Sequence, residues 1–481
     1  MDKSKNKFKF FLDNFIVYGL GGVISKAIPI VMLPIITSLM PNTTYYGLSD
    51  LVSAIVSFAG AFAILGMYDG MYRMFFEKDE IDFKKRVCST TMIFTLISTF
   101  IVCLALFVCR NFLAEKILQS RDYINLIYIA IASTLVSATN CIISAPTRMQ
   151  NKRKVFLITN FISSFLSYSF AIPLVLKHYY VIALPVAALI SAITLELAFY
   201  LINRAWFSFS LFDIRILKDT LKISLPLFPN FLIYWVFNSC DRVMISSYMT
   251  VADVGVYSVG SKLGNVSQLI YTAFAGGWLY FSFSIMKEKD QIETNSKIFE
   301  YMAIVSFIST ALICVINFPF FCLLFNGDYV LGYTIAPYLF LAPLLQMLFQ
   351  IASNQLLIIK KTWPNVFLLS VGAISNVILN MVLIPSIGIE GASIATLIGY
   401  ITTVLITVVI LHRMKLLNYS LRLILLTLVF CFYLIAWRFF FRENFIIGGL
   451  FFVLYLCIVC FYYRYDIKAM ISILKNIKKT V

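Results

Sequence analysis

Long apolar stretches constrain this chain more than any other feature of its sequence. Runs of about 20 or more mostly apolar residues recur from the Lys-rich start to the end. Of the 481 residues, 61% are hydrophobic and only 13% are charged, a composition that excludes an ordinary soluble domain. Only helices and closed barrels satisfy backbone polar groups within lipid, and these runs lack the alternation of barrel strands. We therefore predict an all-α polytopic membrane protein.

The apolar runs predict fourteen transmembrane helices. Their approximate ranges are 12–39, 44–72, 88–109, 123–147, 155–176, 180–203, 223–249, 254–286, 298–325, 331–359, 363–385, 390–411, 420–440 and 445–463. The run at 254–286 is longer than a membrane crossing requires, so we expect it to include an interfacial extension. The first run continues to Met40, too long for the apolar core of a signal peptide, and we predict a retained span.

The distribution of cationic residues predicts the orientation. Of the 39 Lys and Arg residues, 30 fall on the side that holds both termini, six on the opposite side and three within spans. Cytoplasmic loops carry such an excess, so both termini are predicted to lie in the cytoplasm. The net charge of +16 is thereby explained by short turns beside anionic headgroups, without a nucleic-acid partner.

The sequence offers little for catalysis or for a metal. The ten cysteines are scattered through the spans and are interpreted as reduced packing residues. No loop is long enough for a soluble catalytic domain, and the outer loops are short and nearly free of carboxylates. We therefore expect no enzyme activity, no cofactor and no metal site.

Short matches in the same order, about 205–212 residues apart, indicate two related halves. Val155-Phe156-Leu157 matches Val366-Phe367-Leu368, and Tyr46-Gly47-Leu48 lines up with Val254-Gly255-Val256. Parallel repeats of this kind enclose a substrate path and alternate access by rocking. The predicted organisation is a six-helix N-terminal lobe at 1–204, a cytoplasmic linker at 205–222, a six-helix C-terminal lobe at 223–412, and two extra helices with a basic tail at 413–481.

Charges inside the predicted spans mark the candidate site. Lys26, Arg242 and Lys262 each lie within an apolar run, and Asp241 precedes Arg242. A Lys or Arg at the centre of a membrane helix costs about 2.5–3.5 kcal/mol on insertion scales, so these side chains face protein or water.

Polar residues recur every three or four positions beside these charges. Asn238 precedes Asp241-Arg242 in one span, and Asn265 follows Lys262 in the next. This spacing gives each helix one hydrated or protein-facing edge. At about 1.5 Å rise per residue from the turn between the two spans, Arg242 and Lys262 both lie roughly 10–20 Å below the outer surface.

Two interpretations of the charges remain open. Asp50, at a similar depth, or Asp241 could neutralise one cation and lock the helices together. Alternatively, three cations against two acids leave surplus positive charge in a cavity that receives anionic groups, which is the interpretation we favour. Glu196 is more isolated and is either a packing residue or a site for a coupling ion. The predicted substrate-binding residues are Lys26, Asn238, Arg242, Lys262 and Asn265, and the predicted charge-balancing or coupling residues are Asp50, Asp241 and Glu196.

The sequence around these residues resembles bacterial polysaccharide flippases. The similar segments are Ser224-Leu225-Pro226, Asp241-Arg242-Val243-Met244-Ile245, Gly255-Val256-Tyr257-Ser258 with Lys262, Tyr18-Gly19 with Pro29 and Pro34, and Gly388-Ile389-Glu390-Gly391-Ala392-Ser393-Ile394-Ala395-Thr396. The resemblance covers essentially the whole chain and points to the O-antigen and repeat-unit branch of the multidrug, oligosaccharidyl-lipid and polysaccharide (MOP) exporter superfamily.

That resemblance implies two helical lobes that move undecaprenyl-pyrophosphate-linked oligosaccharide from the cytoplasmic to the outer leaflet of the bacterial inner membrane. The implied partners are this lipid, membrane lipids, a coupling H⁺ or Na⁺, and the machinery that polymerises the polysaccharide. The sugar and its pyrophosphate need a polar cavity, while the polyprenyl tail stays in lipid.

Three alternatives are less favoured. A multidrug antiporter of the same superfamily uses acids for cationic drugs and coupling ions, whereas the first span here carries Lys26. A peptidoglycan-precursor (lipid II) flippase also has a cationic cavity, but the second span carries Asp50 in place of a comparable arginine. A membrane-embedded glycosyltransferase or polymerase needs catalytic residues on sizeable outer loops.

Overall fold

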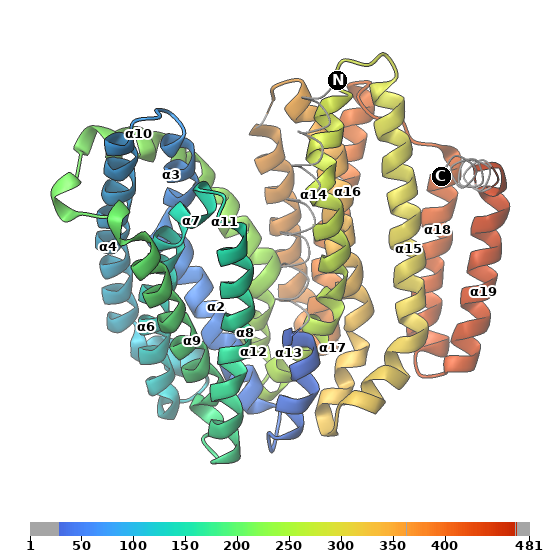
Figure 1. The fold of residues 1–481 in the computed structure, drawn as a ribbon. Helices are drawn as coiled ribbons and strands as arrows, with labels where there is room; N and C mark the ends of the chain where they lie inside the picture. The colour runs from blue at the N-terminus through green and yellow to red at the C-terminus, as the bar shows by residue number, and fades with distance from the viewer. Residues whose placement is uncertain (1–27, 362, 467, 469–481) are drawn as a thin grey trace. The chain divides into compact units, whose positions relative to one another are not determined.

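The computed structural model describes residues 28–361, 363–466 and 468, and every regular element among them is helical (Figure 1). This confirms the predicted all-α class. The principal helices are α2 (Thr44–Ile64), α3 (Met67–Phe75), α4 (Ile81–Val108), α5 (Arg110–Lys116), α6 (Ile124–Ile143), α7 (Ala145–Met149), α8 (Arg153–Leu176), α9 (Tyr180–Asn203), α10 (Ile214–Ser224), α11 (Phe228–Trp235), α12 (Asp241–Tyr248), α13 (Val251–Gly264), α14 (Gln268–Ser284), α15 (Gln291–Leu324), α16 (Ala336–Ile358), α17 (Trp363–Arg413), α18 (Leu421–Ala436) and α19 (Phe445–Tyr462).

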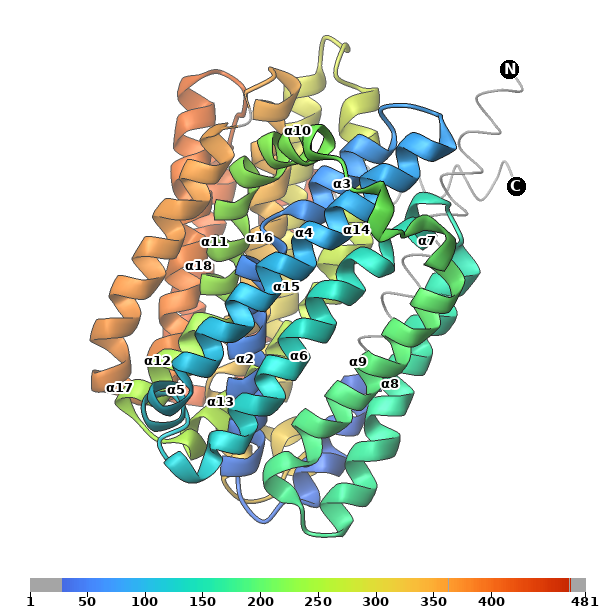
Figure 2. The ribbon, with the colours of Figure 1, turned by 90° about the vertical axis from the view of Figure 1, so that its left-hand side faces the viewer.

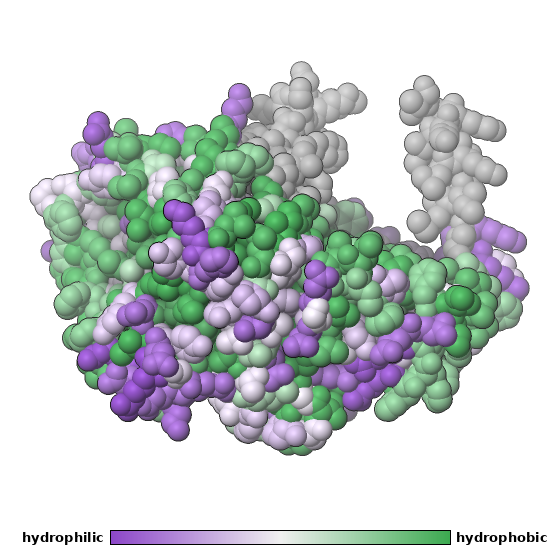
Figure 3. Space-filling view, turned by 90° about the horizontal axis from the view of Figure 1, so that it is seen from below, coloured by the Kyte–Doolittle hydropathy of each residue, from purple (hydrophilic) through white to green (hydrophobic). Residues whose placement is uncertain are grey.

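Ten helices in the described part of the chain are long and apolar enough to cross a membrane. Large apolar side chains on them face outward: Leu323 is 82% exposed and Phe440 is 78% exposed. Hydrophobic residues also occupy much of the surface seen in Figure 3. Such exposure fits a lipid environment, and the protein is a multi-pass membrane protein.

The number of fourteen spans stays a prediction. Two features of the structure explain part of the difference between those fourteen and the ten long apolar helices of the described chain. The predicted spans at 363–385 and 390–411 both fall within α17, whose backbone is non-helical at Ile387 and Gly388. The predicted first span lies outside the described residues up to position 27, and Ile28–Ser38 is a short apolar helix.

Two compact units make up the fold. The first contains the described part of Met1–Leu263 together with Phe325–Gly332 and Leu369–Gly399, and the second contains Gly264–Leu324, Tyr333–Leu368 and the described part of Tyr400–Val481. The middle of α17 therefore belongs to the first unit. The predicted six-helix halves remain a prediction.

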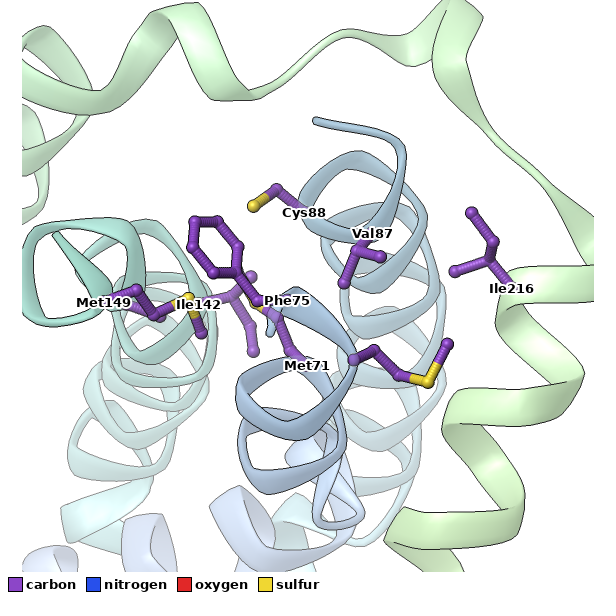
Figure 4. Close-up of a cluster of buried hydrophobic side chains, with 9 residues drawn as sticks. Met71, Phe75, Val87, Cys88, Ile142, Met149 and Ile216 are labelled. Atoms are coloured by element: carbon purple, nitrogen blue, oxygen red, sulfur yellow. The ribbon is translucent and has the colours of Figure 1, made fainter. Parts of the chain in front are cut away.

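Within the first unit, α2, α4 and α6 pack against one another, and α8 packs against α9 (Figure 2). A cluster of buried apolar side chains joins α3, α4, α6, α7 and α10. Figure 4 shows Met71 and Phe75 of α3 between Met149 of α7 and Ile216 of α10. This cluster fixes the short helix α3 beyond the end of α2.

Residues 205–222, predicted to be a linker, are largely folded. A 3₁₀ turn at Phe209–Leu211 leads to α10, and the Asp213 carboxylate caps that helix by accepting from the backbone N–H of Arg215 at 2.8 Å. The backbone N–H groups of Ser208 and Asp213 donate to Ser89 and Thr90 of α4, both at 3.0 Å. The segment is therefore attached to the first unit.

In the second unit, α18 and the π-helical turn after it pack on α15. The Tyr433 hydroxyl donates to the carbonyl of Ala311 at 3.1 Å, and the Trp437 indole donates to the carbonyl of Cys314 at 3.1 Å. These two bonds satisfy the polar ends of large buried aromatic side chains.

Candidate functional site

The helix that carries the predicted charge pair is interrupted just before it. A 3₁₀ turn at Leu225–Leu227 precedes α11, and a π-helical turn at Val236–Cys240 separates α11 from α12. Pro226 lies in the first turn of the 3₁₀ segment and Pro229 in the first turn of α11, where proline is tolerated. A π-turn adds one residue to the helix and rotates the residues beyond it, and such turns are frequent at functional sites. Here the turn sets the directions of Asp241 and Arg242.

Arg242 forms an ion pair with Asp50 of α2. Its Nε donates to the Asp50 carboxylate, one Nη donates to the carbonyl of Asn238, and the other donates to the Ser261 hydroxyl at 3.1 Å. The Ser258 hydroxyl donates to the same Asp50 oxygen at 2.5 Å. The side chains of Arg242 and Asp50 are only 12% and 10% exposed, so the pair is largely buried.

Asp241 points away from this pair into a second buried cluster. Its carboxylate accepts from the Tyr257 and Thr396 hydroxyls, both at 2.6 Å, and from the Asn380 amide at 2.7 Å. Asn376 extends the cluster by donating to Thr396 at 3.0 Å. No Lys or Arg among the described residues comes within ion-pair distance of Asp241, so its hydrogen bonds come from neutral groups.

Lys262 has a different environment from Arg242. Its ammonium group donates to the Tyr46 hydroxyl at 2.5 Å and lies 4.7 Å from the centroid of the same ring. Its side chain is exposed, and within the described chain no carboxylate is in ion-pair distance of it. Two of the predicted cations, Arg242 and Lys262, lie in the described part of the chain. Arg242 is paired with an acid, and Lys262 is not.

The exposed face of Lys262 borders a cavity of about 660 Å³ within the first unit. The lining comes from the helix Ile28–Ser38 and from α2, α3, α6, α7, α8, α9 and α13. Eight serines, three tyrosines and Asn140 contribute polar groups, and Arg148 lies in the lining together with Lys262. No carboxylate occurs among the described lining residues. The cavity is thus polar and positively charged.

The remaining predicted residues are dispersed. Asn238 lies in the π-turn with an exposed side chain that donates to the carbonyl of Tyr234 at 2.7 Å, and Asn265 is exposed in a 3₁₀ turn of the second unit. Glu196 is half-buried on α9 and accepts from the Thr139 hydroxyl at 2.5 Å. Lys26 lies outside the described residues.

Sequence reasoning missed several polar residues around the charges. Asn376, Asn380 and Thr396 surround Asp241 from more than 130 positions away. Gln119, with a left-handed backbone (φ 61°), donates to the carbonyls of Ser246 and Met249, both at 2.6 Å, and accepts from the Val251 N–H at 3.2 Å. It thereby holds the turn between α12 and α13. The sequence offered one general indication of these residues, which is that an amide side chain inside an apolar run needs a hydrogen-bond partner.

Comparison with known families identifies the chain. A family model described as "Polysaccharide biosynthesis protein" matches residues 41–328, more than half of the sequence. The chain belongs to this family. Among curated proteins, no sequence matches it significantly.

Solved structures give the fold of this polysaccharide biosynthesis protein. One titled "Lipid II flippase MurJ, inward closed conformation" matches with a TM-score of 0.68 and 18% identity, covering 94% of this chain and all of that one. One titled "Inward-facing conformation of a multidrug resistance MATE family transporter of the MOP superfamily" matches with a TM-score of 0.61 and 14% identity, covering 82% and 98%. The protein therefore shares the fold of these two solved transporters, which is the fold that the resemblance implied.

Proposed function

We propose that the protein is a flippase for undecaprenyl-pyrophosphate-linked oligosaccharide repeat units, which it moves from the cytoplasmic to the outer leaflet of the bacterial cell membrane by alternating access. The observation that carries the proposal is Lys262, a cation without an acidic partner among the described residues, at the edge of a polar cavity. A pyrophosphate supplies the opposite charge, and the sugars need a polar path. The family match to polysaccharide biosynthesis supports this substrate class.

The proposed orientation has both termini in the cytoplasm, as the excess of Lys and Arg on that side predicts. With the cytoplasm negative, outward movement of each unit of negative charge gains about 2.3 kcal/mol per 100 mV. The membrane potential would then assist export of an anionic lipid.

Arg242 remains a proposed anion ligand, with Lys26, Asn238 and Asn265. In the described conformation its guanidinium donates to Asp50, Asn238 and Ser261. Three of its five N–H donors are engaged, so an anion would meet the other two or compete with Asp50.

Substitution of Lys262 tests the proposal. Lys262→Ala is expected to slow flipping of a lipid-linked oligosaccharide in proteoliposomes by roughly ten- to a hundredfold, because a hydrogen bond to a charged group contributes about 1.5–3 kcal/mol. Lys262→Arg is the matched control and should retain most activity. Both variants are compared with wild type at equal folded amounts.

The outcomes separate the related functions. Normal flipping by Lys262→Ala would contradict the anion-binding role. Absence of flipping by wild type, together with efflux of a cationic dye, would assign the protein to the drug antiporters. Preferential flipping of lipid II would instead favour a peptidoglycan-precursor flippase, whose fold the protein shares.

A coupling ion is a second part of the proposal, and Asp241 is its proposed site. The buried carboxylate is surrounded by neutral oxygen and nitrogen groups, and the nearby Asn380 Oδ1 accepts no hydrogen bond from the described residues. Carboxylate, amide and hydroxyl oxygens together suit a hard cation such as Na⁺, and the carboxylate alone can take H⁺.

An imposed sodium or pH gradient is expected to stimulate flipping by wild type, and Asp241→Asn should remove that stimulation. We expect the stimulated rate to fall at least fivefold, which corresponds to about 1 kcal/mol in activation free energy. The substitution keeps the shape of the side chain but removes its charge. Glu196→Gln tests the other isolated acid among the predicted coupling residues, which is half-buried and bonded to Thr139 alone. Undiminished stimulation in Asp241→Asn would place the coupling site elsewhere.

A further inference from the structure

Hydroxyl groups line the cavity in an unusual way for membrane helices. Serine in such a helix commonly satisfies its hydroxyl by donating back to a carbonyl three or four residues earlier. Ser53 of α2 and Ser169 of α8 do so, at 3.0 Å and 2.9 Å.

Three lining serines do not follow this pattern. The hydroxyls of Ser49 on α2, Ser137 on α6 and Ser167 on α8 form no hydrogen bond with the described residues, and all three side chains are partly or well exposed. Since they border the cavity from three different helices, their free donors and acceptors are available to whatever occupies it. We call these three residues the serine wall.

An amide on α6 shows the same property. Asn140 lines the cavity, and its side-chain oxygen is buried without a hydrogen-bond partner among the described residues. Buried polar atoms are normally paired, so this oxygen retains hydrogen-bonding capacity for a water or a ligand.

The two cations of the lining contact tyrosines on different helices. Lys262 donates to Tyr46, in the first turn of α2, and Arg148 donates to Tyr68 of α3 at 3.3 Å. Between these tyrosines α2 ends at Ile64, and Leu65 and Gly66 are left-handed before α3 begins.

We propose that the serine wall, with Asn140, binds the hydroxyl groups of the sugars, while Lys262 binds the phosphate end of the same lipid. This inference rests on the proposed flippase function and names the part of the substrate that each surface recognises. Side-chain hydroxyls and amides both donate and accept, as sugar hydroxyls do. The cavity's volume of about 660 Å³ lies in the range of pockets that hold ligands larger than a single sugar.

Binding of two probes tests this division. The probes are undecaprenyl pyrophosphate alone and undecaprenyl pyrophosphate carrying a trisaccharide of hexose and N-acetylhexosamine units, measured on the purified full-length protein by native mass spectrometry. The triple variant Ser49→Ala, Ser137→Ala, Ser167→Ala is expected to bind the glycosylated lipid roughly tenfold more weakly, because three modest neutral hydrogen bonds are lost. Its affinity for the unglycosylated lipid should change by less than about twofold.

Two controls accompany the triple variant. The first is Ser169→Ala, two residues from Ser167 on the same helix. The Ser169 hydroxyl donates to the carbonyl of Phe165, and Ser169 is not among the residues that line the cavity. This substitution should leave both affinities unchanged. The second is Lys262→Ala, which should weaken the binding of both probes because both carry the pyrophosphate.

Equal weakening of both probes by the triple variant would show that it disturbs the cavity as a whole, and would overturn the inference. Unchanged binding of the glycosylated lipid would overturn it as well. If wild type flips the glycosylated lipid in proteoliposomes while either result is obtained, the proposed function survives and only the serine wall is excluded. If wild type neither binds nor flips that lipid, the proposed function itself is contradicted, and the inference about the serine wall is contradicted with it.

Discussion

Replacing Arg242 with alanine is expected to lower the free energy of unfolding by about 3–5 kcal/mol, the usual cost of removing one partner of a buried ion pair. The carboxylate of Asp50 would remain buried in the membrane-spanning part of the first unit, with the Ser258 hydroxyl as its remaining partner. A single neutral donor does not compensate a buried negative charge. Thermal unfolding of the purified protein in one detergent, with wild type in parallel, measures the change.

Two variants make that measurement decisive. The double variant Asp50→Asn, Arg242→Gln removes both charges and should recover most of the lost stability. Arg73→Ala removes an exposed cation whose pair with Glu77 is 61% and 46% exposed, and should change stability by less than about 1 kcal/mol. If Arg242→Ala and Arg73→Ala were equally stable, Asp50 and Arg242 would not form a buried pair in the membrane.

The sequence predicted that Asp50 or Asp241 could neutralise one of the cations, because charge inside an apolar run is rare and expensive. Few arrangements satisfy such residues, and their estimated depths already matched. In the structure Asp50 pairs with Arg242, and Lys262 lies beside the cavity without an acidic partner among the described residues. The sequence therefore predicted which residues carry charge into the spans, but only the geometry separates the cation that is paired with an acid from the cation that is not.

The hydrogen-bond partners of Asp241 were beyond such reasoning. Asn380 and Thr396 carry no charge and lie 139 and 155 positions from Asp241, and many similar residues occur in the spans. The π-turn at Val236–Cys240 was equally hidden, because one extra residue in a helix scarcely alters its apolar pattern. Helix class followed from composition, whereas the division of helices into two compact units depends on long-range contacts that composition does not encode.

Close backbone contact between α2 and α13 leads to the second large effect. Gly47 meets the carbonyl of Val251 and the N–H of Gly255, and Gly255 in turn meets the carbonyl of Thr43. Asp50 of α2 also accepts a hydrogen bond from Ser258 of α13, so the two helices lie side by side. A Cβ at position 47 would overlap the Val251 carbonyl oxygen and lie 2.9 Å from the Gly255 nitrogen. Neither neighbour is a side chain that can turn away.

Gly47→Ala is therefore expected to destabilise the protein by about 3 kcal/mol, the upper end of overpacking, and Gly47→Val by more. Thermal unfolding and the monodisperse fraction on gel filtration measure this. Gly449→Ala, on α19, is the matched control, because a Cβ there has nothing within 4 Å, and it should change stability by less than about 1 kcal/mol. Wild-type stability in Gly47→Ala would mean that α2 and α13 are not in backbone contact.

The two large effects should not add. A methyl group at position 47 forces α2 away from α13, and that movement loosens the contacts of Asp50 with Ser258 and Arg242 that Arg242→Ala also removes. Residues that share one contact couple by about 0.5–3 kcal/mol in double-mutant cycles. The variant carrying both Gly47→Ala and Arg242→Ala should consequently be more stable than the sum of the single losses predicts. Strict additivity would instead place the glycine contact and the ion pair in independently stable parts of the first unit.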